Sequence, residues 1–233
     1  MDFREEPAEN ADRDLDLAIE RVAAHPEPDG NLRVMIATTR GEIRAVLHPC
    51  ATAPGAAFYV GGAMGGFEGP AGIYGRLADR LRPQLSGLRL HYRQPGEFQE
   101  CVLDVLAGLS FLRGIGTTGG VALVGHSFGG AVVIKAGELS SAVAGVAALS
   151  PQLYGTHTVE HLGKPLLLVH GMRDDVLDHA ASEDIHARAS EPKRLVLYAE
   201  ADHSLMQSAG DLEELLAGWL PDIVSRRPAV GLN

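Results

Sequence analysis

One stretch sets the architecture of this chain: Gly120-Val-Ala-Leu-Val-Gly-His-Ser-Phe-Gly-Gly-Ala-Val-Val-Ile-Lys135. Its residues 121–124 form a short apolar run that is typical of a fully buried strand. The G-x-S-x-G pattern of residues 125–129 follows at once, and a helix-compatible segment begins directly after it. A serine on so sharp a strand-to-helix turn has a strained backbone, and its hydroxyl projects above the sheet edge. Ser127 is therefore a candidate nucleophile.

Two glycines flank this serine where the turn leaves no room for a side chain. Gly125 and Gly129 stand two residues before and two residues after it, and a Cβ atom at either position would collide across a tight turn. The following helix would place free N–H groups and partial positive charge beside the hydroxyl. An ordinary glycine-rich turn with an incidental serine is the competing interpretation, and only partners for the serine argue against it.

The composition indicates one globular domain preceded by an acidic leader. The chain has 233 residues, enough to bury a substantial core, and no apolar run long enough to span a bilayer. Its net charge of −10 argues against nucleic acid as a partner, and residues 1–30 carry ten acidic and three basic side chains. We expect an acidic extension over residues 1–30, a domain over residues 31–233, no membrane association and, without a secretory signal, a cytoplasmic location. Cys50 and Cys101 have no C-x-x-C spacing, so we expect free thiols.

The order of apolar segments predicts an α/β fold with a mostly parallel central sheet and helices on both faces. We expect strands over 32–39, 42–48, 56–60, 88–92, 121–124, 143–149, 166–169 and 194–198. We expect helices over 14–24, 72–85, 97–113, 179–190 and 210–226, with one more helix after the G-x-S-x-G pattern. The first two strands form an N-terminal hairpin around Arg40-Gly41. In such sheets ligands bind beyond the carboxyl ends of the strands.

Two later segments supply partners for the serine. A serine hydroxyl is a weak nucleophile that needs an adjacent base, and the base needs an orienting acid. Asp174 follows the strand over 166–169, and His203 follows the strand over 194–198. The chain order Ser127, Asp174, His203 is the order expected for this architecture. Asp175, the next residue, is the alternative acid.

These motifs resemble the corresponding segments of the α/β-hydrolase fold superfamily. The segments are Gly-His-Ser-Phe-Gly-Gly at 125–130, His-Gly-Met-Arg-Asp-Asp-Val at 170–176 and Ala-Asp-His-Ser-Leu at 201–205. The likeness runs from about residue 34 to the final helix. Within the superfamily, the chain most resembles small esterases and dienelactone-hydrolase-like members. It implies an α/β-hydrolase fold with Asp174 as the acid, because the family's acid lies four residues after the histidine of the His-Gly pair. Dienelactone hydrolases proper use a cysteine nucleophile. Because this chain has a serine instead, the resemblance does not imply that it acts on their substrate.

The resemblance also implies an oxyanion hole made of two backbone N–H groups. One N–H belongs to Phe128, directly after the nucleophile. The other comes from Gly61-Gly-Ala-Met64, which stands in place of the family's His-Gly-x-x and selects Ala63, with Met64 as the alternative. Gly61 replaces the usual histidine, so the anchoring of this loop is unexplained. Met64, Phe67 and Phe128 are candidate apolar walls of the substrate pocket.

A second pattern, His157-Thr-Val-Glu-His161, matches a zinc-binding sequence that functions on a long helix. Gly155, Gly163 and Pro165 leave only about two helical turns here, so we expect surface histidines and no metal. The loop over 61–66 lacks the Lys-Ser/Thr of a phosphate-binding loop, so we expect no nucleotide and no cofactor.

Only about fifteen residues separate Ser150 from Lys164, where relatives often insert a helical lid. We therefore expect no large cap and an open site that suits a small or accessible acyl group. The sequence predicts a serine hydrolase that cleaves a small-molecule carboxylic ester through an acyl-enzyme. A thioesterase, an amidase or an acyltransferase would use the same three residues. A non-catalytic binding module of the same fold is the rival from another class, and the sequence does not indicate the oligomeric state.

Overall fold

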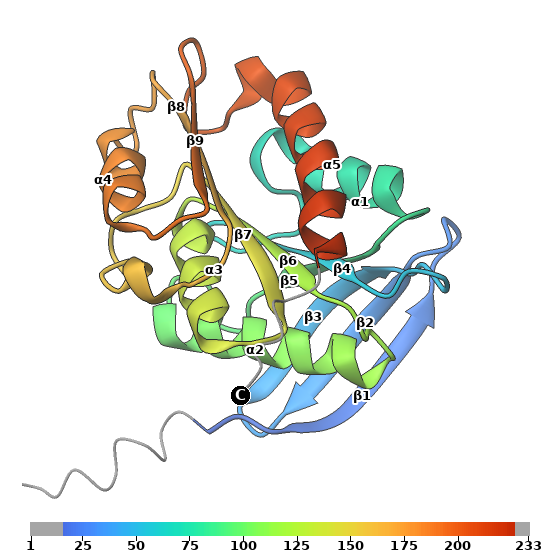
Figure 1. Cartoon of the computed structure of the whole chain (residues 1–233). Coiled ribbons are helices and arrows are strands. Elements are labelled where there is room, and N and C mark those ends of the chain that lie inside the picture. The colour runs from blue at the N-terminus through green and yellow to red at the C-terminus, as the bar shows by residue number, and fades with distance from the viewer. Residues whose placement is uncertain (1–15, 227–233) are drawn as a thin grey trace, which may run out of the picture.

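The computed structural model describes residues 16–226 and is built on one nine-stranded sheet (Figure 1). The spatial order is β1-β2-β3-β5-β4-β6-β7-β8-β9. The strands are β1 Ile19–Pro26, β2 Leu32–Thr38, β3 Gly41–His48, β4 Ala56–Val60, β5 Ser86–His91, β6 Val121–His126, β7 Val143–Leu149, β8 Leu166–Gly171 and β9 Lys193–Tyr198. The pairings β1–β2, β2–β3 and β3–β5 are antiparallel, and all others are parallel. The predicted mostly parallel sheet is confirmed.

Helices cover both faces of this sheet. On one face lie α2 Phe98–Gly114, α3 Phe128–Leu139 and α4 Ala180–Arg188, and on the other lie α1 Ile73–Leu81 and α5 Ala209–Ser225 (Figure 1). Each face buries its own apolar cluster: in β6, Leu123 belongs to the first cluster and Val124 to the second. Successive side chains of a strand point to opposite faces, so a strand covered on both sides is apolar throughout. This explains the uninterrupted apolar run before Ser127.

The hairpin predicted near the N-terminus is formed by β2 and β3, with Thr38 paired to Gly41. Its two-residue loop is Thr39-Arg40, one residue earlier than expected. The Thr38 hydroxyl donates to the carbonyl oxygen of Gly41 at 2.7 Å and accepts from the backbone N–H of Arg40 at 3.1 Å. A threonine side chain thus closes the turn.

The helix expected over 14–24 is wrong within the described residues, because β1 occupies residues 19–26 and pairs antiparallel with β2. Residues 14 and 15 lie outside the described part. The helical spacing of Leu15, Ala18, Ile19 and Val22 is short, and an isolated helix of about ten residues is marginal in water. Pairing instead satisfies the N–H and C=O groups along the free edge of β2, which an exposed edge strand would leave open.

No large cap interrupts the fold between β7 and β8. Residues 150–165 contain a single 3₁₀ turn, η4 Val159–His161, among otherwise irregular backbone. Within the described residues, the connection from β7 to β8 therefore adds no helical lid over the carboxyl ends of these strands. Among the helices within residues 16–226, none combines the length and apolarity needed to cross a membrane.

Candidate active site

Ser127 lies at the turn between β6 and α3, in a backbone conformation that few residues other than glycine adopt. Its φ is 59° and its ψ is −122°. The turn is held by two hydrogen bonds, from the Ser127 N–H to the Leu149 carbonyl at 2.8 Å and from the Gly130 N–H to the Ser127 carbonyl at 2.9 Å. A strained residue that neighbouring bonds hold in place is the expected geometry of a nucleophile elbow.

The two flanking glycines are required by close backbone contacts. A Cβ atom on Gly125 would lie 2.1 Å from the carbonyl oxygen of Gly129, and one on Gly129 would lie 2.1 Å from the carbonyl oxygen of Gly61. Neither backbone oxygen can move without displacing the turn or the neighbouring loop. The positions predicted to need glycine therefore do need it.

Gly125→Ala is expected to destabilise the protein by about 3 kcal/mol, since overpacking against backbone cannot be relieved by a rotamer change. Gly218→Ala is the matched control, because its new Cβ atom in α5 would have nothing within 4 Å. Replacing an exposed helical glycine by alanine should instead stabilise by roughly 0.5–1 kcal/mol. Urea unfolding of both variants measures the difference, and equal midpoints would contradict this account of the turn.

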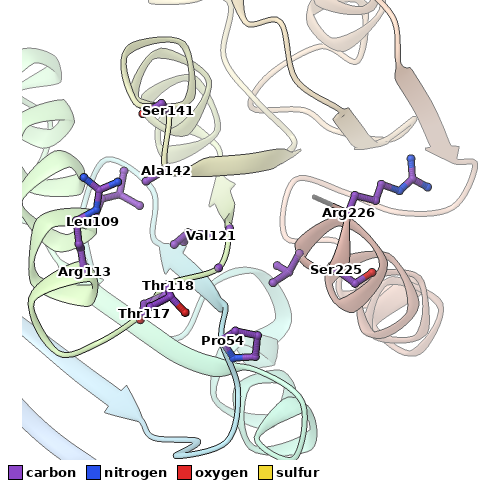
Figure 2. A pocket seen from close by; sticks show the side chains of 13 residues that line it. Pro54, Leu109, Arg113, Thr117, Thr118, Val121, Ser141, Ala142, Ser225 and Arg226 are labelled. Atoms are coloured by element: carbon purple, nitrogen blue, oxygen red, sulfur yellow. The ribbon is translucent and has the colours of Figure 1, made fainter. Parts of the chain in front are cut away.

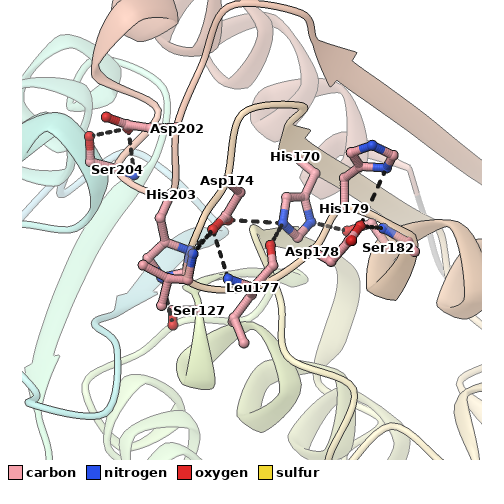
Figure 3. A network of polar contacts seen from close by, with 12 residues as sticks. Ser127, His170, Asp174, Leu177, Asp178, His179, Ser182, Asp202, His203 and Ser204 are labelled. Carbon is pink, nitrogen blue, oxygen red and sulfur yellow. Dashed lines mark hydrogen bonds and ion pairs between the residues drawn. The ribbon is translucent and has the colours of Figure 1, made fainter.

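The structure brings Ser127, His203 and Asp174 into one hydrogen-bonded line (Figure 3). His203 Nε2 lies 3.0 Å from Ser127 Oγ, and His203 Nδ1 lies 2.7 Å from Asp174 Oδ2. Because a carboxylate only accepts, Nδ1 carries the proton, and the unprotonated Nε2 accepts from the serine hydroxyl. This tautomer is the one in which a histidine can remove the serine proton.

Asp174, and not its alternative Asp175, faces the histidine. The Asp174 side chain is fully buried, while Asp175 is exposed. Asp174 Oδ1 accepts the backbone N–H groups of Val176 and Leu177 at 2.9 and 2.8 Å. Burial raises the pKa of Asp174, but the Leu177 N–H, the His203 ring and the Val176 N–H outweigh it and hold the pKa below its usual range. Asp174 is therefore an ionised partner for His203.

The backbone of His203 is held by a second histidine, whose role the sequence did not indicate. His126 Nε2 donates to the carbonyl oxygen of His203 at 2.9 Å, and the two ring centroids are 4.9 Å apart. Burial lowers the pKa of His126 to about 4, so this ring is neutral at neutral pH. His126 therefore anchors the loop that carries His203.

The loop after β4 lies against the serine. A Cβ atom on Gly62 would be 3.5 Å from Ser127 Cβ, so Ala63 follows directly after the point of contact. Within residues 16–226, the N–H groups of Phe128, Ala63 and Met64 have no hydrogen-bond acceptor. These contacts fit the predicted pair of Phe128 and Ala63, although their role as an oxyanion hole stays a prediction.

His91 at the end of β5 and Tyr92 directly after it anchor this loop in place of the missing histidine. His91 Nδ1 accepts the backbone N–H of Gly66 at 2.7 Å, and the Tyr92 hydroxyl donates to the Gly61 carbonyl at 3.4 Å. The loop closes on itself through the Gly65 N–H, which donates to the Gly62 carbonyl at 2.9 Å. The anchoring of the loop, which the sequence left unexplained, comes from these two side chains and from the loop's own hydrogen bond.

The candidate pocket walls lie in different surroundings. The Met64 side chain is 90 % exposed, and Phe67 packs on His91 with ring centroids 5.8 Å apart. The ring of Phe128 is buried and makes edge-to-face contacts with Tyr92 and Phe98, and its role as a pocket wall stays a prediction. The role of Met64 and Phe67 in binding substrate stays a prediction.

A cavity of about 860 Å³ lies at the other end of the sheet (Figure 2). Pro54 precedes β4, Gly120 precedes β6, and the end of α5 completes its wall. These residues belong to the amino ends of the strands, whereas Ser127 follows the carboxyl end of β6. Ligand sites of open α/β sheets lie beyond the carboxyl ends, so we assign this cavity no part in the chemistry.

The zinc-like pattern and the cysteines have no hydrogen bond to Ser127, His203 or Asp174 among the described residues. The residues Val159 to His161 form one 3₁₀ turn, and the His157 ring packs on Tyr154. In the described part of the chain no group of three or more His, Cys, Asp or Glu side chains is arranged to hold a metal ion. Cys50 and Cys101 are free thiols, and Cys101 donates to the Gln94 carbonyl.

Comparisons with known proteins agree with this fold. The sequence profile of the dienelactone hydrolase family matches residues 71–215, more than half of the chain. No match was found among curated protein sequences.

Solved structures extend the likeness to nearly the whole fold. Est1E from Butyrivibrio proteoclasticus has a TM-score of 0.70 and 15 % identity, covering 83 % of this chain and 99 % of that chain. XC6422 from Xanthomonas campestris, described as an α/β serine hydrolase without lid, has a TM-score of 0.70 and 17 % identity, covering 88 % and 100 %. Acetyl xylan esterase 1 from Thermoanaerobacterium sp. has a TM-score of 0.69 and 13 % identity, covering 88 % of each chain. At these identities the likeness shows the fold: an α/β hydrolase without a lid.

Proposed function

The chain belongs to the dienelactone hydrolase family, and from that premise we propose that it is a serine hydrolase that cleaves a carboxylic ester through an acyl-enzyme intermediate. The observation that carries the proposal is the line from Ser127 Oγ through His203 to the buried, ionised Asp174, with donor–acceptor distances of 3.0 and 2.7 Å. A binding module would need neither of these two contacts. The cytoplasmic location, the absence of nucleic-acid and membrane partners and the domain division at residue 30 stay predictions.

The proposed reaction follows from the protons already in place. Ser127 Oγ attacks the ester carbonyl carbon while His203 Nε2 takes its proton, and Asp174 stabilises the imidazolium that forms. The N–H groups of Phe128 and Ala63 receive the negative charge that develops on the carbonyl oxygen. The intermediate expels the alcohol, which takes the proton from His203. Water then attacks the acyl-enzyme carbonyl while His203 Nε2 takes its proton. The acid leaves, and His203 returns the proton to Ser127.

The missing cap predicts how activity depends on acyl length. An enclosed acyl tunnel would gain about 0.8 kcal/mol for each buried methylene, so four extra methylenes would raise kcat/KM more than a hundredfold. Residues 150–165 provide no helical insertion to enclose a chain. We therefore expect p-nitrophenyl acetate and butyrate to be hydrolysed at least as efficiently as the octanoate. Initial rates across the three esters test this, and a tenfold or greater preference for octanoate would contradict the open site.

A further inference from the structure

Asp174 is held by two histidines, and only one of them is His203. In Figure 3 the carboxylate lies between the ring of His203 and the ring of His170. The same oxygen, Asp174 Oδ2, is 2.7 Å from His203 Nδ1 and 3.0 Å from His170 Nε2. The His170 side chain is fully buried at the end of β8, where no solvent can replace its contacts.

The partners of His170 fix which of its nitrogens carries the proton. Nε2 faces two acceptors, Asp174 Oδ2 at 3.0 Å and the Leu177 carbonyl oxygen at 2.9 Å, so it is the protonated donor. Nδ1 lies 2.7 Å from the hydroxyl of Ser182, which is itself buried in α4. Burial lowers the pKa of His170, so the ring is neutral, and its Nδ1 accepts the Ser182 proton.

We propose that His170 is a positioning residue that, tied to α4 through Ser182, holds the carboxylate of Asp174 in line with His203 by donating its Nε2–H to Asp174 Oδ2. The inference deepens the proposed function and rests on it. The backbone carbonyl of Leu177 shares this proton with the carboxylate of Asp174.

A second donor is needed because Asp174 Oδ2 would otherwise have only one hydrogen-bond donor. Two backbone N–H groups secure Oδ1, but Oδ2 would otherwise depend on His203 alone, and that ring gains and loses a proton in each catalytic cycle. A buried carboxylate is costly unless every oxygen is well bonded. His170 supplies a donor whose proton does not take part in the reaction. A misplacement of about 1 Å in such machinery can cost a hundredfold in rate.

Three ionisable groups and one hydroxyl surround His170, each from a different element. Asp174 belongs to the loop after β8, and His203 to the loop after β9. His126 at the end of β6 and His203 both act on His170 electrostatically, and Ser182 faces it from α4. Removing the His170 donor leaves more of the negative charge of Asp174 for a protonated His203. We therefore expect the acid limb of the pH–rate profile to move to higher pH.

The test compares His170→Leu with His170→Gln in the full-length protein, using p-nitrophenyl butyrate from pH 5 to 9. His170→Leu keeps a similar volume without a donor, and we expect kcat to fall by about ten- to a hundredfold with KM changed less than about twofold. His170→Gln restores an amide N–H donor, and kcat should return to within about threefold of wild type with the original acid limb. His48→Leu is the matched control: it removes another buried histidine, bonded to Asp79 at 2.7 Å, and should lower stability without changing kcat.

A readout without substrate separates this inference from the proposed function. The low-field proton resonance of His203 Nδ1–H should move downfield in His170→Leu and stay in place in His170→Gln and His48→Leu. An unmoved resonance in folded His170→Leu overturns the positioning role whether or not esters are hydrolysed. Where esters are hydrolysed, a His170→Gln variant as impaired as His170→Leu also overturns it. Activity that survives in Ser127→Ala overturns the proposed function instead. In that case the His203 resonance still tests whether His170 donates to Asp174.

Discussion

Ser127→Ala is expected to lower kcat/KM for p-nitrophenyl butyrate by at least about 10⁴-fold, because the acyl-enzyme can no longer form. The residual rate should come from the remaining donors and from binding, which in serine hydrolases keep about 10³–10⁴-fold catalysis over water. KM should change little, since the hydroxyl is not needed to hold the ester. Steady-state kinetics of both proteins, with concentrations taken from their absorbance, measures the loss.

The fold of this variant should survive. Alanine keeps the backbone bonds from the Ser127 N–H to Leu149 and from Gly130 to the Ser127 carbonyl, so circular dichroism and the unfolding midpoint should stay close to wild type. A folded Ser127→Ala protein that retains a tenth or more of the wild-type kcat/KM would show that the serine at this turn is not the nucleophile.

Asp174→Asn is expected to lower kcat by about 10³–10⁴-fold with the geometry largely intact. An amide can donate to His203 Nδ1, which would place the imidazole proton on Nε2, where it cannot accept from Ser127. The loss therefore arises from the wrong tautomer.

Asp175→Asn is the control for that variant, because it makes the same change one residue later on an exposed side chain. It should stay within about threefold of wild type when kcat is measured under the same conditions. The reverse order of effects would mean that Asp175 is the acid and that the loop over 172–179 has a different conformation in solution.

The elbow and the three aligned residues could be predicted from the sequence because their constraints are local. An apolar strand, two glycines at fixed spacing and a following helix leave one geometry for Ser127. Asp174 and His203 follow strands whose carboxyl ends must meet at one sheet edge, so their proximity follows from the topology. The choice between Asp174 and Asp175 required the structure, because the backbone conformation of the loop determines which carboxylate faces His203.

Non-local contacts could not be predicted in the same way. The segment over 19–26 has a helical spacing of apolar residues, and only the free edge of β2 makes it a strand. The bonds from His91 to Gly66 and from His170 to Asp174 depend on which side chains meet across strands and loops. His170 lies four residues before Asp174 in a recognisable motif, and this position was the only sequence signal for its contact with Asp174. Its second partner, Ser182 on α4, has no counterpart in that pattern.

The most direct measurement is mass spectrometry of the protein after reaction with a fluorophosphonate, which labels only an activated serine. We predict a single adduct on the wild-type protein, located on Ser127 by peptide mapping, and none on Ser127→Ala. His203→Ala, which removes the base while leaving the hydroxyl, should slow labelling by at least about a hundredfold. Wild-type protein that stays unlabelled, or a label on another residue, would contradict the assignment of Ser127 as the nucleophile.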